Sequence, residues 1–311
     1  MSKLFPTILS QVKAPPIKCQ GIKTKLIPFI AQNIEWNGDG RWIEPFLGSG
    51  SVLFNLKPPI ALVSDTNKHI ITFYNELKSG KINEAIVRDY LCQMGKKLTK
   101  RGEKFYYEVR DEFNEKGGSL EFLFLNRSCF NGLMRFNSDG KYNVPFGHKP
   151  QRFSKSYITK IVNQVAWVRS LIKRYDWEFI VSDFRMTLKT AKQNDFVYLD
   201  PPYIGRHTDY FNSWDDSDAE EMVRCVKQLP CGYAISMWQE NKYRKNEHID
   251  KFWLTETIQH FNHFYHVGST ENLRNEIIEA LIIRNGYSSI SQLVSTKRSE
   301  KEIALFEIPT A

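Results

Sequence analysis

Strand-like and helix-like segments alternate at both ends of the chain. Short apolar runs bounded by polar, glycine or proline residues predict strands at 42–45, 60–64, 178–182, 195–199, 232–236, 252–258 and 276–284. Apolar residues at helical spacing predict helices over 66–78 and 216–229. This alternation is typical of βαβ units, so we expect an α/β fold built on a largely parallel sheet.

Between about residues 80 and 165 the alternation stops. Helical patterns over 81–94, 103–114 and 119–129 follow one another there, with a Gly117-Gly118 break. The turn sequence from Asn137 to Gly140 then lies between two aromatic, amide-rich and basic arms. Because glycine and Asx residues tolerate positive φ, this sequence predicts a β-hairpin. We expect this block to be an inserted, mainly helical domain that carries the hairpin.

One predicted strand ends in residues that are suited to chemistry. The apolar run 196–199 is typical of a strand buried on both faces, and Asp200, Pro201, Pro202 and Tyr203 follow it directly. Open α/β sheets bind ligands outside the carboxyl ends of their strands. The Asp200 carboxylate and a carbonyl with a proline-fixed direction form a paired acceptor that suits an exocyclic amine. Tyr203 offers a flat face on which a base could stack.

Two further strand ends carry acids. Glu44 closes the strand at 42–45, and the turn from Phe46 to Gly50 has glycines that would let a ligand approach the backbone. Tight strand-to-helix turns also need glycine for steric reasons alone, and this turn lacks the spacing of a dinucleotide or P-loop motif. Asp65 ends the next strand, where an acid can accept ribose hydroxyls, cap the following helix, or do both.

Taken in order, these elements resemble the Dam-like (D12 class, alpha group) DNA adenine-N6 methyltransferase family. The segment Lys18–Lys23 is similar to the family's N-terminal element, although Cys19 replaces the usual tryptophan and Ile22 replaces a glycine. The segments Phe130–Asn137 and Gly140–Gly147 resemble the family's DNA-reading hairpin. This long pair separates the family from methyltransferases in general.

The resemblance implies a Rossmann-like methyltransferase sheet and S-adenosyl-L-methionine as methyl donor. Residues 1–79 and 166–311 would form the catalytic, cofactor-binding domain, and 80–165 the DNA target-recognition domain. Neither a metal nor a covalent intermediate is expected. The implied catalytic residues are Asp200, Pro201, Pro202 and Tyr203. The implied cofactor-binding residues are Gly21, Lys23, Glu44, Phe46, Gly48, Gly50, Asp65, Asp183, Phe184 and Asp200.

The resemblance also implies how DNA is read. Arg135 would contact a guanine, and Phe130 would stack into the space left by a flipped base. For Phe136 and Tyr142, packing on the domain's own helices is expected as readily as a DNA contact. The implied DNA-binding residues are Lys18, Phe130, Asn131, Leu133, Arg135, Asn137, Asn143 and Pro145.

The expected activity is transfer of a methyl group to N6 of a flipped adenine in a short double-stranded site. A restriction-modification role is expected, with a cognate endonuclease that acts on the same site without a stable complex. Two alternatives stay open. A cytosine-N4 methyltransferase is disfavoured by Asp rather than Ser at position 200 and by the hairpin. A DNA-binding regulator with a disabled site is disfavoured by the intact Asp200, Lys23, Gly48 and Asp65.

Composition agrees with this interpretation. The 311-residue chain has a net charge of +8 and a pI near 9.1, which favours a polyanionic partner. We find neither an apolar run of membrane-spanning length nor a signal-peptide core, so we expect a cytoplasmic protein. The five scattered cysteines include no Cys-x-x-Cys pair and read as reduced thiols.

Overall fold

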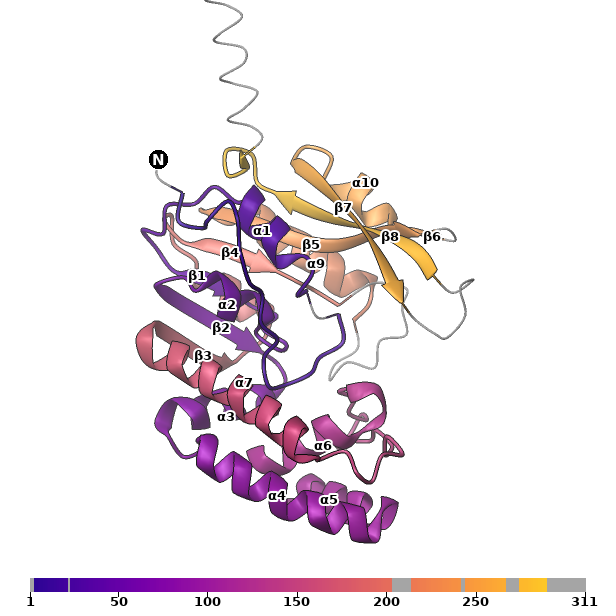
Figure 1. Cartoon of the computed structure of the whole chain (residues 1–311). Helices are drawn as coiled ribbons and strands as arrows, with labels where there is room; N and C mark the ends of the chain where they lie inside the picture. The colour runs from indigo at the N-terminus through magenta and orange to yellow at the C-terminus, as the bar shows by residue number, and fades with distance from the viewer. Residues whose placement is uncertain (1–2, 22, 203–213, 242–243, 267–273, 290–311) are drawn as a thin grey trace, which may run out of the picture.

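The computed structural model describes residues 3–21, 23–202, 214–241, 244–266 and 274–289. The chain forms a twisted sheet with helices on both faces, and a group of helices lies beyond one edge of that sheet (Figure 1). No helix in the described ranges combines the length and the apolar character that a membrane crossing needs.

The fold is of the α/β class, as the sequence predicts. Among the described residues it has eight strands in the order β3-β2-β1-β4-β5-β8-β7, and β6 pairs with β5. Neighbours among β1 to β5 run parallel, whereas β8 runs antiparallel to both β5 and β7. The strands are β1 (Trp42–Glu44), β2 (Ile60–Asp65), β3 (Asp176–Val181), β4 (Phe196–Leu199), β5 (Gly232–Asn241), β6 (Arg244–Lys245), β7 (Thr257–His266) and β8 (Arg274–Ile283).

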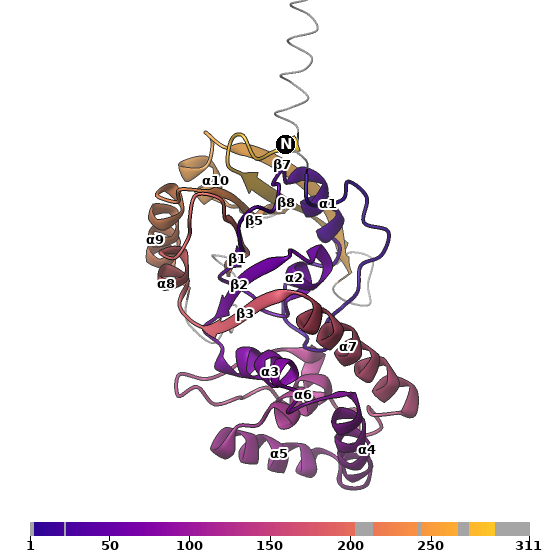
Figure 2. The ribbon, with the colours of Figure 1, turned by 90° about the vertical axis from the view of Figure 1, so that its left-hand side faces the viewer.

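Side chains alternate between two cores, one on each face of the sheet. Trp42 and Tyr198 point into the core on one face, and Ile43, Val197 and Leu199 point into the core on the other. Helices cover both faces, so the central strands are apolar on both sides (Figure 2). The helices nearest the sheet are α1 (Ile27–Asn33), α2 (Ser51–Leu56), α3 (Lys68–Ser79), α7 (Lys155–Arg174), α8 (Phe184–Leu188), α9 (Asp216–Lys227) and α10 (Glu247–Phe252).

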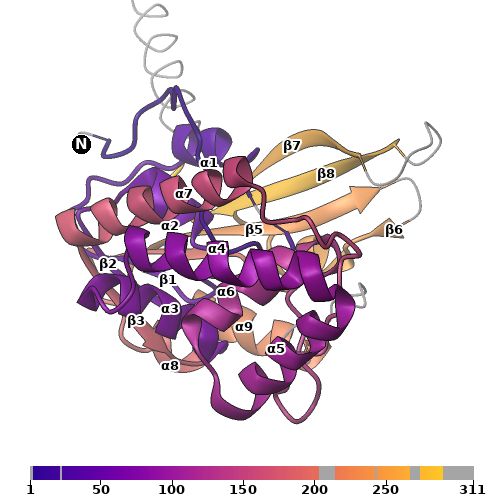
Figure 3. The ribbon, with the colours of Figure 1, turned by 60° about the horizontal axis from the view of Figure 1, so that its bottom comes forward.

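The predicted insert is helical. Helices α4 (Glu84–Arg101), α5 (Glu103–Lys116) and α6 (Ser119–Ser128) lie between α3 and α7 in the chain and pack together beside α7 (Figure 3). The Asn83 side chain caps α4, and the positive φ angles of Gly117 and Gly118 separate α5 from α6. Helix α7 continues past the expected domain boundary at 165, so one rigid helix joins the insert to β3.

The predicted strand at 252–258 is wrong for its first residues, because α10 ends at Phe252 and β7 begins only at Thr257. Asn246 caps α10, and the buried Trp253 packs in the core beneath the sheet instead of extending a strand. An apolar run next to a short helix has the same pattern as a strand start.

The segment 129–147 folds back on itself, but neither arm forms a regular strand. The arms pair at two isolated bridges, Phe136 with Tyr142 and Cys129 with Phe146, and further backbone hydrogen bonds join them, such as that from the Phe130 amide to the Pro145 carbonyl. Between the bridges lies a single 3-10 turn, η1 (Phe130–Gly132), in which Asn131 has a φ of 51° and Gly132 a φ of 67°. These two positive φ angles bend the first arm away from ladder geometry.

Candidate active site and nucleic-acid interface

The carboxyl ends of the parallel strands meet at one edge of the sheet and carry acids there. Glu44 ends β1 and Asp65 ends β2, and Asp65 lies opposite Val181, the last residue of β3. Asp183 follows two residues later, and Asp200 directly follows β4, the other neighbour of β1. Four predicted site residues from four separate motifs therefore lie along one edge.

Lys23 joins the N-terminal element to this edge. Its ammonium is 3.1 Å from Oδ1 of Asp200 and 3.6 Å from Oε2 of Glu279 on β8. Lys23 and Glu279 are 3% and 1% exposed, whereas the Asp200 side chain keeps 23% exposure. The two carboxylates share one buried cation, and Asp200 is the member that a ligand can reach. Glu279 is not predicted from the sequence, where it is a single acid inside the apolar run of β8.

Asp200 has a raised pKa. Burial is the main cause, Lys23 opposes it and the charge of Glu279 adds to it, so that the pKa is raised to about 6. Above that pH the carboxylate is ionised and can accept hydrogen bonds from an amine. The following Pro201 is buried and Pro202 is half-buried, whereas Tyr203 lies outside the described residues.

Glu44 differs from Asp200 although both close neighbouring strands. It is fully buried and accepts a 3.0 Å hydrogen bond from the indole nitrogen of Trp42. Burial, together with the Asp200 charge, raises the pKa of Glu44 to about 8, although the hydrogen bond from Trp42 lowers it. Glu44 therefore keeps its proton to a higher pH than an exposed glutamic acid does.

Asp65 organises the glycine turn. Its Oδ2 accepts the amide of Gly48 at 2.8 Å, and its Oδ1 accepts the amide of Asn67 at 2.8 Å. Asn67, not Asp65, is the N-cap of α3, so the predicted capping role is only indirect. Gly48 and Gly50 both have positive φ, and a Cβ at Gly50 would lie 2.4 Å from the Phe54 ring. Glycine is required there by the turn itself.

An aromatic cluster lies beside Asp183. The rings of Phe46 and Phe184 stack at 5.5 Å, and Trp214 lies 5.6 Å from each of them. Asp183 caps α8 through the amide of Arg185 and pairs with that guanidinium at 3.0 Å. Phe46 and Phe184, predicted from separate motifs, thus lie in contact, and Trp214 is an addition that no sequence motif indicated.

The N-terminal element also contacts the recognition segment. The Asn126 side chain accepts the Lys18 amide at 2.8 Å and donates to the Lys18 carbonyl at 2.9 Å. A Cβ on Gly132 would lie 2.5 Å from Cδ of Lys18, so the lysine stem packs against η1. Gly21 lies further along this element and has a φ of 71°, which favours glycine. Predicted DNA contacts from two distant segments are therefore adjacent.

Arg135 is held in place by Asn143 from the opposite arm. Its Nε donates to Asn143 Oδ1 at 2.8 Å, and a terminal nitrogen donates to the Asn143 carbonyl at 3.2 Å. Phe130 is 45% exposed, so part of its ring faces solvent. Asn137 closes the turn by accepting the amides of Asp139 and Lys141.

The remaining hairpin residues divide into buried and exposed positions. Asn131 and Pro145 are exposed, Leu133 is half-buried, and the Pro145 carbonyl accepts the amide of Phe130. Phe136 and Tyr142 are buried, which supports the interpretation that they pack on the domain's own helices. The Asn114 side chain of α5 accepts the Tyr142 amide and donates to the Tyr142 carbonyl, as Asn126 does with Lys18.

Comparison with known proteins identifies the family independently of this geometry. The family described as D12 class N6 adenine-specific DNA methyltransferase matches residues 20–267. The type II methyltransferase M.MjaIII of Methanocaldococcus jannaschii is 29% identical, covering 68% of this chain and 78% of that protein. The DNA adenine methylase of Serratia marcescens is 32% identical over 60% of this chain and 68% of its own length. The type II methyltransferase M1.LlaDCHI of Lactococcus lactis is 29% identical over 69% of this chain and 76% of that protein.

The fold and the acids along its carboxyl edge define a methyltransferase of the Rossmann-like class. The match extends over most of the chain, so the protein belongs to the D12 class of N6 adenine-specific DNA methyltransferases.

Proposed function

We propose that this enzyme transfers a methyl group to N6 of an adenine that has left the DNA duplex, and that Asp200 is its catalytic carboxylate. The supporting observation is the position of Asp200 at the end of β4, bound to a buried ammonium and still accessible. The N6 lone pair of adenine is delocalised into the ring, which makes the amine a poor nucleophile. Asp200 and the Pro201 carbonyl would accept its two hydrogens and so return electron density to the nitrogen.

S-adenosyl-L-methionine supplies a sulfonium methyl group, and family membership implies a donor of this type. The residues present fit that molecule. Phe46 and Phe184 form an aromatic face for its adenine, and the Asp65 carboxylate lies where ribose hydroxyls bind in such folds. Asp65 already accepts two amides, but a carboxylate has about four acceptor positions, which leaves capacity for a hydroxyl.

The reaction needs little beyond positioning. The new N–C bond would form as the S–C bond of the donor breaks, which leaves a neutral thioether, and the amine proton would pass to the Asp200 carboxylate or to water. Asp200, with a pKa near 6, holds the amine hydrogens in its ionised form above that pH. The base must leave the duplex to reach the edge of the sheet, and the exposed Phe130 is suited to stack in the vacated space.

We further propose that residues 1–79 and 166–311 bind the cofactor and residues 80–165 recognise double-stranded DNA. In support, Lys18 packs against Gly132 in the turn that begins at Phe130, and Arg135 and Asn143 are hydrogen-bonded to each other in the same segment. The type II names of two relatives favour a restriction-modification role, with a cognate endonuclease acting on the same site.

The test is Asp200→Asn, which keeps the shape of the side chain and removes its charge. Methyl transfer from labelled donor should fall by about 10²-fold or more, the scale for losing an acid–base group. DNA binding should stay close to wild type, whereas the melting temperature should fall, because the buried Lys23 then pairs with Glu279 alone. Asp195→Asn is the matched control, because Asp195 holds loop amides and Arg41 at the opposite end of β4. Substantial turnover by the Asp200→Asn variant would remove Asp200 from the catalytic role.

A further inference from the structure

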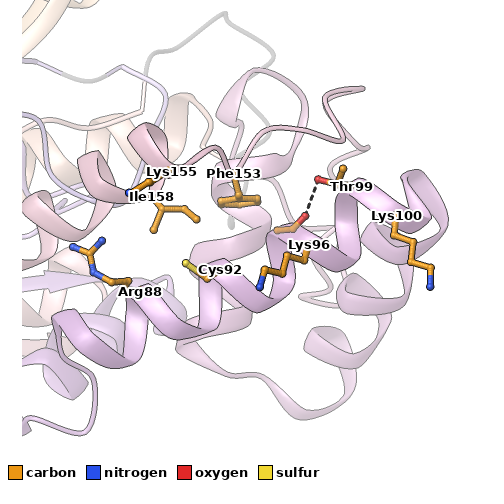
Figure 4. A pocket seen from close by; sticks show the side chains of 9 residues that line it. Arg88, Cys92, Lys96, Thr99, Lys100, Phe153, Lys155 and Ile158 are labelled. Carbon is orange, nitrogen blue, oxygen red and sulfur yellow. Dashed lines mark hydrogen bonds between the residues drawn. The ribbon is translucent and has the colours of Figure 1, made fainter.

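A pocket of about 440 Å³ lies between α4 and the start of α7, outside the site described above (Figure 4). Cys92, Gly95, Phe153 and Ile158 form its apolar part. Gly95 permits the close approach of the two segments, because a Cβ there would lie 2.7 Å from Cβ of Phe153. The remaining lining residues are Arg88, Lys96, Thr99, Lys100 and Lys155.

The pocket rim is strongly basic. Four of its nine lining residues are cations and none is an acid. None of Arg88, Lys96, Lys100 and Lys155 forms an ion pair with a described carboxylate, although many other cations of the chain do. Like charges at i and i+4 on a helix, as at Lys96 and Lys100, are destabilising unless an anion offsets them. The pocket is therefore suited to a ligand that carries phosphates.

The spacing of the cations favours a polymer over a single phosphate. Arg88, Lys96 and Lys100 lie on one face of α4, and twelve residues of helix span about 18 Å. One phosphate cannot contact all of them, whereas DNA carries a charge every 3.4 Å or so along each strand. The insert over 80–165 contains 16 Lys and Arg against nine Asp and Glu, so it holds +7 of the chain's +8.

The pocket also adjoins the predicted DNA-facing segment. Its Phe153 ring stacks on Phe124 of α6 at 5.1 Å, and Asn126 on the same helix holds Lys18. The neighbouring Arg152 lies over the Tyr157 ring and donates to the Arg127 carbonyl at 3.2 Å. Basic residues thus continue from the recognition segment to the pocket.

We propose that this pocket binds backbone phosphates of DNA that flanks the methylated site. The contact is sequence-independent and extends the footprint of the enzyme along the duplex. The proposal rests on the proposed function, since it requires that Lys18 and the recognition segment face DNA.

The test compares two duplexes centred on the methylated sequence, about 12 and about 36 base pairs long, with the double variant Lys96→Gln/Lys100→Gln. On the long duplex, affinity at 0.1 M salt should fall about tenfold, and the slope of log K against log salt should decrease by about two units. On the short duplex both quantities should stay as in the wild type. The matched control, Lys97→Gln/Lys104→Gln, removes two exposed charges from the same domain outside the pocket and should change neither.

Three results would overturn the proposal. The pocket variant could leave the long-duplex slope unchanged, or the control variant could lose as much as the pocket variant. Alternatively, calorimetry could show that ATP binds the wild type and not the pocket variant while DNA binding is unaffected, which would assign the pocket to free nucleotides. Methyl transfer to the short duplex is measured separately, so its absence would instead count against the proposed function.

Discussion

Among single residues, Lys23 has the most unusual environment, because its ammonium is buried between two carboxylates from distant parts of the chain. A buried lysine is costly unless it is paired, and removing one partner of such a group leaves charge uncompensated. Asp200 and Glu279 both pair with the Lys23 ammonium, and Lys23 in turn orients Asp200. Glu279 is therefore a positioning residue that acts through Lys23.

This arrangement predicts the effect of Glu279→Gln on pH dependence. The Glu279 charge raises the pKa of Asp200, so its removal should lower that pKa below about 6. Asp200 must be ionised to accept the amine, hence the acidic limb of the profile of kcat/KM against pH, which reports the free enzyme, should shift to lower pH. Methyl transfer measured from pH 5 to 8 checks this, with a melting curve at each pH as the folding control. An unmoved acidic limb would show that Glu279 does not influence Asp200.

Asp65 is predicted to have two roles that can be separated. Asp65→Asn should weaken S-adenosyl-L-methionine binding by about 1.5–3 kcal/mol, the scale of a hydrogen bond to a charged group. Calorimetry gives the dissociation constant, and Asp195→Asn is again the control for loosened loop amides. If affinity is unchanged, Asp65 only supports Gly48 and Asn67. If both variants lose affinity equally, the loss reflects destabilisation.

At the scale of elements, the local sequence pattern predicted those strand ends that depend on neighbouring residues alone. The ends of β1, β2 and β4 are predicted by apolar runs that stop at an acid. The glycines in the turn after β1 are predicted in the same way. The irregular arms at 129–147 could not be predicted, because Asn114 and Tyr106 of α5 hold their backbone through tertiary hydrogen bonds. The Phe46–Trp214 contact was equally hidden, since it joins residues far apart in sequence.

Arg135 carries the prediction for the recognition segment. Asn143 aligns its guanidinium, and a bidentate contact with guanine would read one base pair. Arg135→Ala should cost about 1–3 kcal/mol on the cognate duplex and relax discrimination at that base pair alone. Activity on the cognate duplex and on single-substitution duplexes, each at two salt concentrations, checks this.

The control variant is Lys141→Ala, which removes an exposed cation from the same segment. A phosphate contact would weaken binding to all duplexes alike and lower the salt slope by about one unit. If Arg135→Ala behaves in that way, Arg135 positions the backbone, and specificity resides elsewhere.

At the scale of the whole molecule, the sequence predicted the class of sheet and the inserted block of helices. It could not supply the antiparallel placement of β8 between β5 and β7, which brings Glu279 to Lys23. Strand order depends on packing between segments that are distant in the chain, so no local pattern contains it. The resemblance to a known family predicted the type of sheet, but it did not indicate that Glu279 pairs with Lys23.

The most direct test of the account is mass analysis of nucleosides in DNA from a methylation-free host that expresses this chain. We predict N6-methyladenine with the wild type and none with Asp200→Ala, at equal levels of folded protein. N4-methylcytosine in its place, no modified base with the folded wild type, or N6-methyladenine that persists in the Asp200→Ala variant would contradict the assignment of adenine methylation to Asp200.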